Sequence, residues 1–145
     1  MIRRADFPPC EPSEGEARIR PMSVLSKLKC PPCSGSTPAL TAGEIAPLAK
    51  ELPSWEIVAG HHLHRTVATE EFVDALALAT RIGRVAEKAG HHPDLLVAYG
   101  RLGIDIFTHK IDGLTTGDFI LAAKIDEVLG PARGKRRPSK KSAKR

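Results

Sequence analysis

The period of the apolar residues changes along the middle of the chain, and this change most narrows the folds available to it. From Phe72 to Ala86, apolar residues and a glycine recur every three or four positions, which is typical of an amphipathic helix. Acidic residues before this segment and Gly90 after it favour a helix with defined ends. From Leu102 to Thr108 the apolar residues alternate, which predicts a strand with one buried face. The middle of the chain is therefore expected to contain both a helix and a strand.

The other elements complete the order helix, strand, strand, helix, strand, strand, helix. Thr41 and Glu44 form a capping box for a helix to about Glu51, although Pro47 favours a later start for this helix. A last helix is expected after Thr115, which serves as its N-cap. Two hairpins are expected, with strands at residues 55–58 and 62–67 and at residues 95–99 and 102–108. The pattern predicts an α+β fold, αββαββα, in which three helices pack on one face of a four-stranded antiparallel sheet.

Composition divides the chain into three parts. Residues 1–39 hold seven of the 12 prolines and show no sustained apolar period, which predicts a flexible leader. Residues 40–130 form one domain, and a domain this short buries only part of its surface, so we expect a homodimer or homotetramer. Residues 131–145 hold eight basic residues and no acidic ones. We expect this tail to be disordered and solvated, with a charge that suits nucleic acid or an acidic partner as its ligand.

The cysteines and the apolar runs bear on the compartment. No apolar stretch approaches the roughly 18 residues of a membrane helix, and no apolar run follows the basic N-terminus, so neither a membrane protein nor a secretory signal is expected. An odd number of cysteines, three, favours a reducing compartment, and we expect a cytoplasmic protein. Cys30 and Cys33 form a C-x-x-C motif in the Pro-rich leader, where neither a redox helix nor a full zinc site is predicted.

Two adjacent histidines, His91 and His92, follow the Gly90 stop and precede Pro93. Proline favours an extended conformation for the residue before it, so the pair is presented on a rigid corner. Imidazoles exchange protons near neutral pH, which suits general acid–base chemistry. A solvated loop with a chance pair is the alternative. A zinc site with His109 is a further alternative, but adjacent histidines rarely converge on one ion.

Other polar residues have simple structural interpretations. Asp118 falls at the third position of the last helix, where a carboxylate caps well. Tyr99 is the only tyrosine and is expected to be half-buried in a hairpin. A second group of histidines lies at the first hairpin turn and is expected to be exposed, without chemistry: His61, His62 and His64.

The spacing of the polar residues after the long helix resembles that of one enzyme family. Glu87 to Asp94 reads Glu-Lys-Ala-Gly-His-His-Pro-Asp. Five residues separate Pro93 from Tyr99, nine separate Tyr99 from His109, and eight separate His109 from Asp118. Over residues 40–128 the chain resembles the pterin-4a-carbinolamine dehydratase family. It departs from the family at Leu95, where members often carry an aromatic residue.

The resemblance implies a reaction: loss of water from 4a-hydroxytetrahydrobiopterin to give quinonoid dihydrobiopterin, in support of pterin recycling. It implies no metal and no redox cofactor. Three histidines would supply the acid–base catalysis: His91, His92 and His109. Four further residues would orient these imidazoles or bind the pterin: Glu87, Pro93, Tyr99 and Asp118.

Non-enzymatic relatives of the same fold suggest a second function, in which the chain binds a partner protein. One group assists RuBisCO assembly, and another is a dimerisation cofactor of a transcription factor. The assembly factors tend to lack part of the histidine set that stands complete here, which favours the enzyme. The basic tail favours a partner-binding scaffold.

Overall fold

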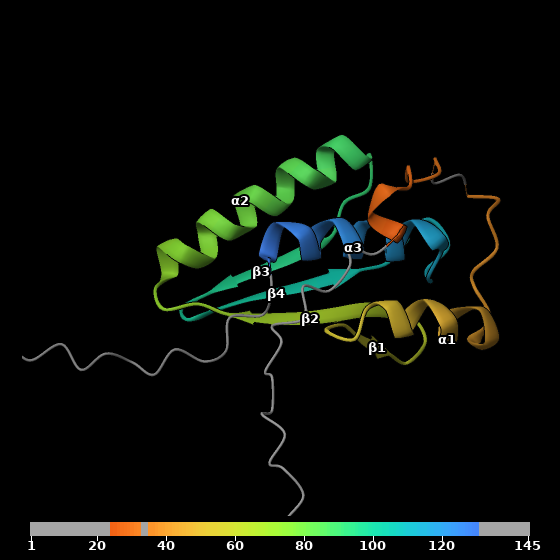
Figure 1. Ribbon diagram of the computed structural model, residues 1–145, viewed down its shortest axis with the longest axis horizontal. Helices are drawn as coiled ribbons and strands as arrows, with labels where there is room; N and C mark the ends of the chain where they lie inside the picture. The colour runs from red at the N-terminus through yellow and green to blue at the C-terminus, as the bar shows by residue number, and fades with distance from the viewer. Residues whose placement is uncertain (1–23, 33–34, 131–145) are drawn as a thin grey trace, which may run out of the picture.

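The structure is a computed structural model that describes residues 24–32 and 35–130 (Figure 1). Its elements in chain order are η1 (Val24–Lys27), α1 (Ala42–Glu51), β1 (Glu56–Val58), β2 (His62–Ala68), α2 (Phe72–Ala89), β3 (Asp94–Ala98), β4 (Arg101–Ile106) and α3 (Thr116–Leu129). The predicted α+β fold and the order αββαββα are confirmed. Cys10, Cys33 and the basic tail lie outside the described residues. No described helix is both long and apolar enough to cross a membrane.

The four strands form one antiparallel sheet in the order β1-β2-β4-β3. Leu63 pairs with Ile106, and both side chains are buried on the face that α2 and α3 cover (Figure 1). Side chains alternate between the faces of a strand, so His64 and its partner Asp105 point to the opposite face. α1 contributes Ile45 to the same hydrophobic core. One face of the sheet is therefore apolar and covered, and the other carries the histidines of β2.

Small side chains let α2 lie close to the sheet. Its buried residues follow the helical period and are Ala75, Ala79, Ile82 and Ala86. Phe72 and Leu76, which we predicted on this apolar face, are instead 46% and 50% exposed. At 3.6 residues per turn, Leu76 lies about 100° around the helix from Ala75, at the flank of the buried stripe. The sequence pattern therefore predicts a wider buried face on α2 than the sheet covers.

The strand boundaries differ from the prediction by one or two residues, whereas the first helix begins directly after the predicted cap at Thr41. α1 begins at Ala42 although Pro47 lies inside it, because the capping box at Thr41 already satisfies the first turn. The proline removes one hydrogen bond, to the carbonyl of the exposed Gly43, which water can satisfy. The second hairpin turns at Gly100, whose φ is +76°, and β4 begins at Arg101, one residue before the predicted start at Leu102.

The described packing begins before residue 40, where we expected the domain to start. η1 lies against α3 (Figure 1), and Leu25 is buried in the core. Lys124 of α3 donates a hydrogen bond from Nζ to the carbonyl of Ser26 at 2.8 Å. Part of the proline-rich segment thus packs on the helix that carries Asp118.

The capping box of α1 predicts an acid-dependent contribution to stability. The backbone and side-chain hydrogen bonds from Thr41 lower the pKa of Glu44 below its ordinary value of 4.5. A lowered folded-state pKa stabilises the fold above the unfolded-state pKa, and this stability is lost as pH falls through the folded-state value. Glu44→Gln should therefore flatten the fall in the free energy of unfolding below about pH 4.5. Urea unfolding at several pH values measures it, with Glu70→Gln as the control; an unchanged pH profile would contradict this.

Candidate active site

The buried carboxylate of Asp118 collects hydrogen bonds from three segments of the chain. Its Oδ2 accepts from the Thr115 N–H at 2.6 Å and from the hydroxyls of Thr115 at 3.1 Å and Thr108 at 2.9 Å. Its Oδ1 lies 2.5 Å from Nε2 of His91. Asp118 is 0% exposed and His91 only 5%. A charge excluded from water is tolerated where it is paired and hydrogen-bonded, as it is here.

These hydrogen bonds join the histidine corner to the end of β4. Gly90 adopts the left-handed conformation at the end of α2, with φ of +64°, and the His91 N–H then donates to the carbonyl of Ala86 at 3.2 Å. This fixed turn directs His91 towards Asp118, which also binds Thr108. His92 follows His91 directly, and His109 follows Thr108. The single carboxylate therefore anchors the neighbours of both exposed histidines.

The two exposed histidines each lie beside a carboxylate. Nε2 of His92 is 2.9 Å from Oε1 of Glu87, and the two side chains are 61% and 77% exposed. Nε2 of His109 is 3.5 Å from Oδ2 of Asp94, with side chains 56% and 61% exposed. A carboxylate this close to an imidazole orients the ring. Both rings are therefore open to a ligand, and each has a carboxylate beside it.

The structure brings together most of the predicted site residues, but not all of them. The Asp118 hydrogen bonds connect His91 with the end of β4, and Glu87 joins through His92. Pro93 links the corner to β3. Tyr99 lies at the other end of β3, about 16 Å along the strand from Asp94, and is 79% exposed. The expectation that Tyr99 is half-buried is wrong, because it occupies the hairpin turn.

The histidines of the first hairpin turn and β2 were given no role and were expected to be exposed, but they are half-buried and paired. Nε2 of His61 is 2.8 Å from Oδ1 of Asp112, and Nδ1 of His64 is 2.5 Å from Oδ1 of Asp105. The end of β4 covers this group, because Phe107 packs against His61. The signal that could have revealed the pairing is the alternation of His62, His64 and Asp105 on facing strands.

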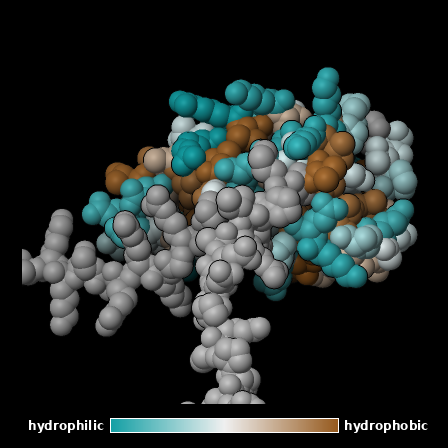
Figure 2. Space-filling view, viewed as in Figure 1, coloured by the Kyte–Doolittle hydropathy of each residue, from teal (hydrophilic) through white to brown (hydrophobic). Residues whose placement is uncertain are grey.

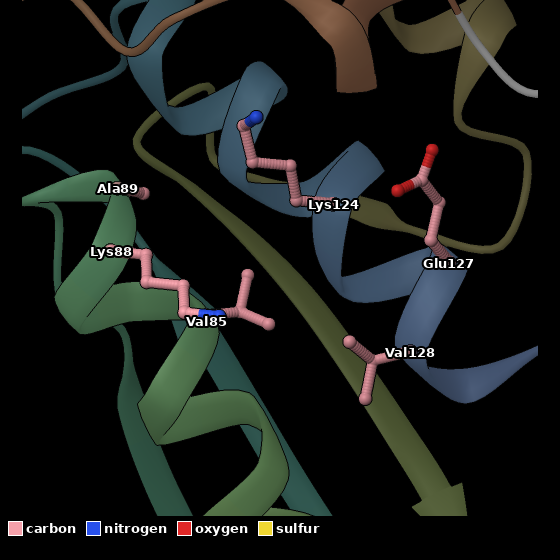
Figure 3. A pocket seen from close by; sticks show the side chains of 6 residues that line it. All are labelled: Val85, Lys88, Ala89, Lys124, Glu127 and Val128. Carbon is pink, nitrogen blue, oxygen red and sulfur yellow. The ribbon is translucent and has the colours of Figure 1, made fainter.

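A shallow hollow lies elsewhere, between the C-terminal halves of α2 and α3 (Figure 3). Val85 and Val128 face one another across it, and it is lined by Val85, Lys88, Ala89, Lys124, Glu127 and Val128. No histidine lines this hollow, so it offers no counterpart to the Asp118 site. Within residues 24–32 and 35–130, no group of three histidine, cysteine, aspartate or glutamate side chains could hold a metal ion.

Comparison with known proteins assigns the family. The family model described as pterin 4 alpha carbinolamine dehydratase matches residues 38–128. The chain belongs to this family. The expected resemblance is thus confirmed over the whole domain that carries the histidines.

Individual relatives of this dehydratase-family chain agree. A protein of Rubrobacter xylanophilus named "Putative pterin-4-alpha-carbinolamine dehydratase" is 47% identical over 107 residues, which cover 74% of this chain and 100% of the relative. A protein of the same name from Alkaliphilus metalliredigens is 45% identical over 107 residues, covering 73% and 96%. The crystal structure of a transcriptional coactivator/pterin dehydratase from Brucella melitensis is 29% identical, with a TM-score of 0.59, and covers 64% of this chain and 100% of that one.

Removal of the Asp118 carboxylate should destabilise the fold. Asp118→Ala leaves the Thr115 N–H, the Thr108 hydroxyl and His91 without their buried acceptor, and we expect a loss of about 3 kcal/mol in the free energy of unfolding. Asp118→Asn keeps one acceptor oxygen and should lose less. Urea denaturation measures both, with the exposed Glu127→Ala as the matched control. A loss for Asp118→Ala no larger than for the control would show that this network is not essential to the fold.

Proposed function

We propose that the protein is a 4a-hydroxytetrahydrobiopterin dehydratase, a hydro-lyase that forms quinonoid dihydrobiopterin without a metal or redox cofactor. Membership of the dehydratase family supports the reaction class. The observation that carries the proposal is the pair of solvent-open histidines, His92 and His109, each beside a carboxylate and each adjacent to a residue that Asp118 binds. Such a dehydratase would serve pterin recycling after aromatic amino-acid hydroxylation.

The reaction needs two proton transfers and no change in oxidation state. The C4a–O bond breaks as the hydroxyl takes a proton and leaves as water. The proton on N5 is removed, and the electron pair of the broken N5–H bond forms the C4a–N5 double bond. A positioned acid and a positioned base each accelerate such a step by about 10²- to 10⁴-fold. Two imidazoles with separate carboxylate partners supply one group for each transfer.

The buried and the exposed histidines take different parts in this proposal. His92 and His109 face solvent and exchange the protons. His91 was predicted as a third acid–base residue, but because it is only 5% exposed and its Nε2 lies 2.5 Å from Asp118, we give it instead the role of holding the corner in place. Glu87 orients His92 through its 2.9 Å contact. Pro93 restricts the backbone between the corner and β3.

Loss of either exposed imidazole should abolish most of the catalysed rate. We expect His92→Ala and His109→Ala each to lower kcat by at least about 10²-fold, because one proton transfer then falls to water. Stopped-flow measurement of 4a-hydroxytetrahydropterin dehydration, with the uncatalysed rate subtracted, gives the comparison. His64→Ala, which removes a histidine paired on the open face of the sheet, is the control. A wild-type rate equal to that of His92→Ala would count against catalysis by His92, and a wild-type rate equal to the uncatalysed rate would rule out the enzyme.

A binding role is the second candidate, because the Brucella relative is described as a coactivator as well as a dehydratase. A scaffold needs no proton transfer, so the alanine variants at His92 and His109 would retain partner capture. Pull-down of RuBisCO subunits by the wild type and by these variants separates the two functions. Capture without any dehydratase activity would favour the assembly-factor reading.

A homo-oligomer is part of the same proposal. The first turns of α2 expose apolar side chains, Phe72 at 46%, Val73 at 61% and Leu76 at 50%, and Figure 2 shows hydrophobic residues on the surface over the α2 side of the molecule. Contiguous apolar surface of this kind marks interfaces. Leu76→Glu should shift the mass measured by light scattering towards the monomer, whereas Lys88→Glu, at the other end of α2, should not. A monomeric wild type would exclude the oligomer.

A further inference from the structure

Phe107, at the end of β4, lies between two imidazole rings. Its ring centroid is 4.1 Å from that of His109, with the planes tilted by 36°. On its other side the centroid of His61 is 4.9 Å away, with a tilt of 43°. Aromatic rings at 4.5–7 Å attract one another beyond their area burial, and the contact with His109 is closer still. Phe107 therefore holds one face of the exposed His109 ring.

The first hairpin turn places His61 against Phe107. The His61 N–H donates to the carbonyl of Val58 at 2.9 Å, and the two residues between them, Ala59 and Gly60, have φ of +52° and +65°. Two central residues with positive φ are characteristic of a type I′ turn, which matches the twist of paired strands. The backbone position of His61 is thus set by the hairpin turn.

A second contact ties His61 to the turn that carries His109. Nε2 of His61 lies 2.8 Å from Oδ1 of Asp112. Asp112 has φ of +50°, and the turn is closed by the Thr108 N–H donating to the carbonyl of Gly113 at 2.9 Å. Aspartate and asparagine tolerate this left-handed conformation better than most residues. Contacts therefore link His109 to Phe107, Phe107 to His61, and His61 to Asp112, which lies in the same turn as His109.

Both nitrogens of the His61 imidazole have a partner. A carboxylate only accepts hydrogen bonds, so Nε2 of His61 carries a hydrogen towards Asp112. Its Nδ1 lies 3.1 Å from Nδ1 of His62, and one of these two nitrogens donates to the other. An imidazole with both nitrogens engaged is poorly placed to exchange protons with a ligand. Its contacts instead fix its neighbours.

We propose that His61 is a positioning residue for His109, which it holds in place by stacking on Phe107 and by pairing with Asp112. The role of His109 in proton transfer rests on the proposed function, but the positioning itself does not. Phe107 alone contacts only one face of His109, which is 56% exposed. The tie from His61 to Asp112 restrains the backbone turn on which His109 stands.

Kinetics give the first test. Displacement of a catalytic group by about 1 Å can cost up to about 10²-fold, so His61→Ala should lower kcat by about tenfold and leave KM within about twofold. His61→Phe keeps a ring against Phe107 but loses the pair with Asp112, and it should fall between wild type and His61→Ala. His64→Ala is the matched control, because His64 lies on β2 and pairs with Asp105. A fall in kcat for His64→Ala as large as for His61→Ala would overturn the proposal.

Imidazole NMR gives the second test, and it does not depend on activity. The ring protons of His109 lie near the face of Phe107 and should be shifted upfield in the folded wild-type protein. His61→Ala should reduce this shift and broaden the His109 resonances, whereas His64→Ala should leave them unchanged. Unchanged His109 resonances in His61→Ala would overturn the positioning role. If the wild type is inactive but His61→Ala still changes the His109 resonances as expected, the proposed function is refuted and the positioning role stands.

Discussion

One buried carboxylate holds the candidate site together. Asp118 accepts hydrogen bonds from the start of its own helix, from the end of β4 and from the corner after α2. Without this acceptor, the buried Thr115 N–H, the Thr108 hydroxyl and the His91 imidazole would each lose a hydrogen-bond partner. The stability of the fold and the geometry of the site therefore depend on the same atoms.

This arrangement separates the group that fixes geometry from the groups that meet a ligand. His91 and Asp118 are buried, whereas His92 and His109 are more than half exposed. Exposed side chains alone would be mobile and would position a ligand poorly. Because each follows a residue that Asp118 binds, their backbones are restrained while their imidazoles remain open. The contacts of His109 with Phe107 and of Phe107 with His61 further restrain the exposed His109 ring.

Most of the fold could be predicted from local patterns. The capping residues Thr41 and Thr115, the stop at Gly90 and the alternation from Leu102 to Thr108 each reflect interactions between residues close in sequence. Prediction failed where burial was inferred from the sequence pattern alone. Phe72 and Leu76 have the right period for a buried face, but burial depends on how far the sheet extends beneath α2. Tyr99 fits the family spacing, yet the hairpin places it at the far end of β3 from the histidines.

The sequence by itself determined the element order, the α+β class and the polar residues that carry the family resemblance, because periodicity, capping and spacing are local properties of the chain. Only the tertiary structure decided which histidines are open and which are closed. His91 and His92 are adjacent and chemically identical in the sequence, but one points to Asp118 and the other to solvent. The structure also paired His61 with Asp112, which lies 51 residues away. Burial and long-range pairing arise when separate segments pack, so no local pattern could have fixed them.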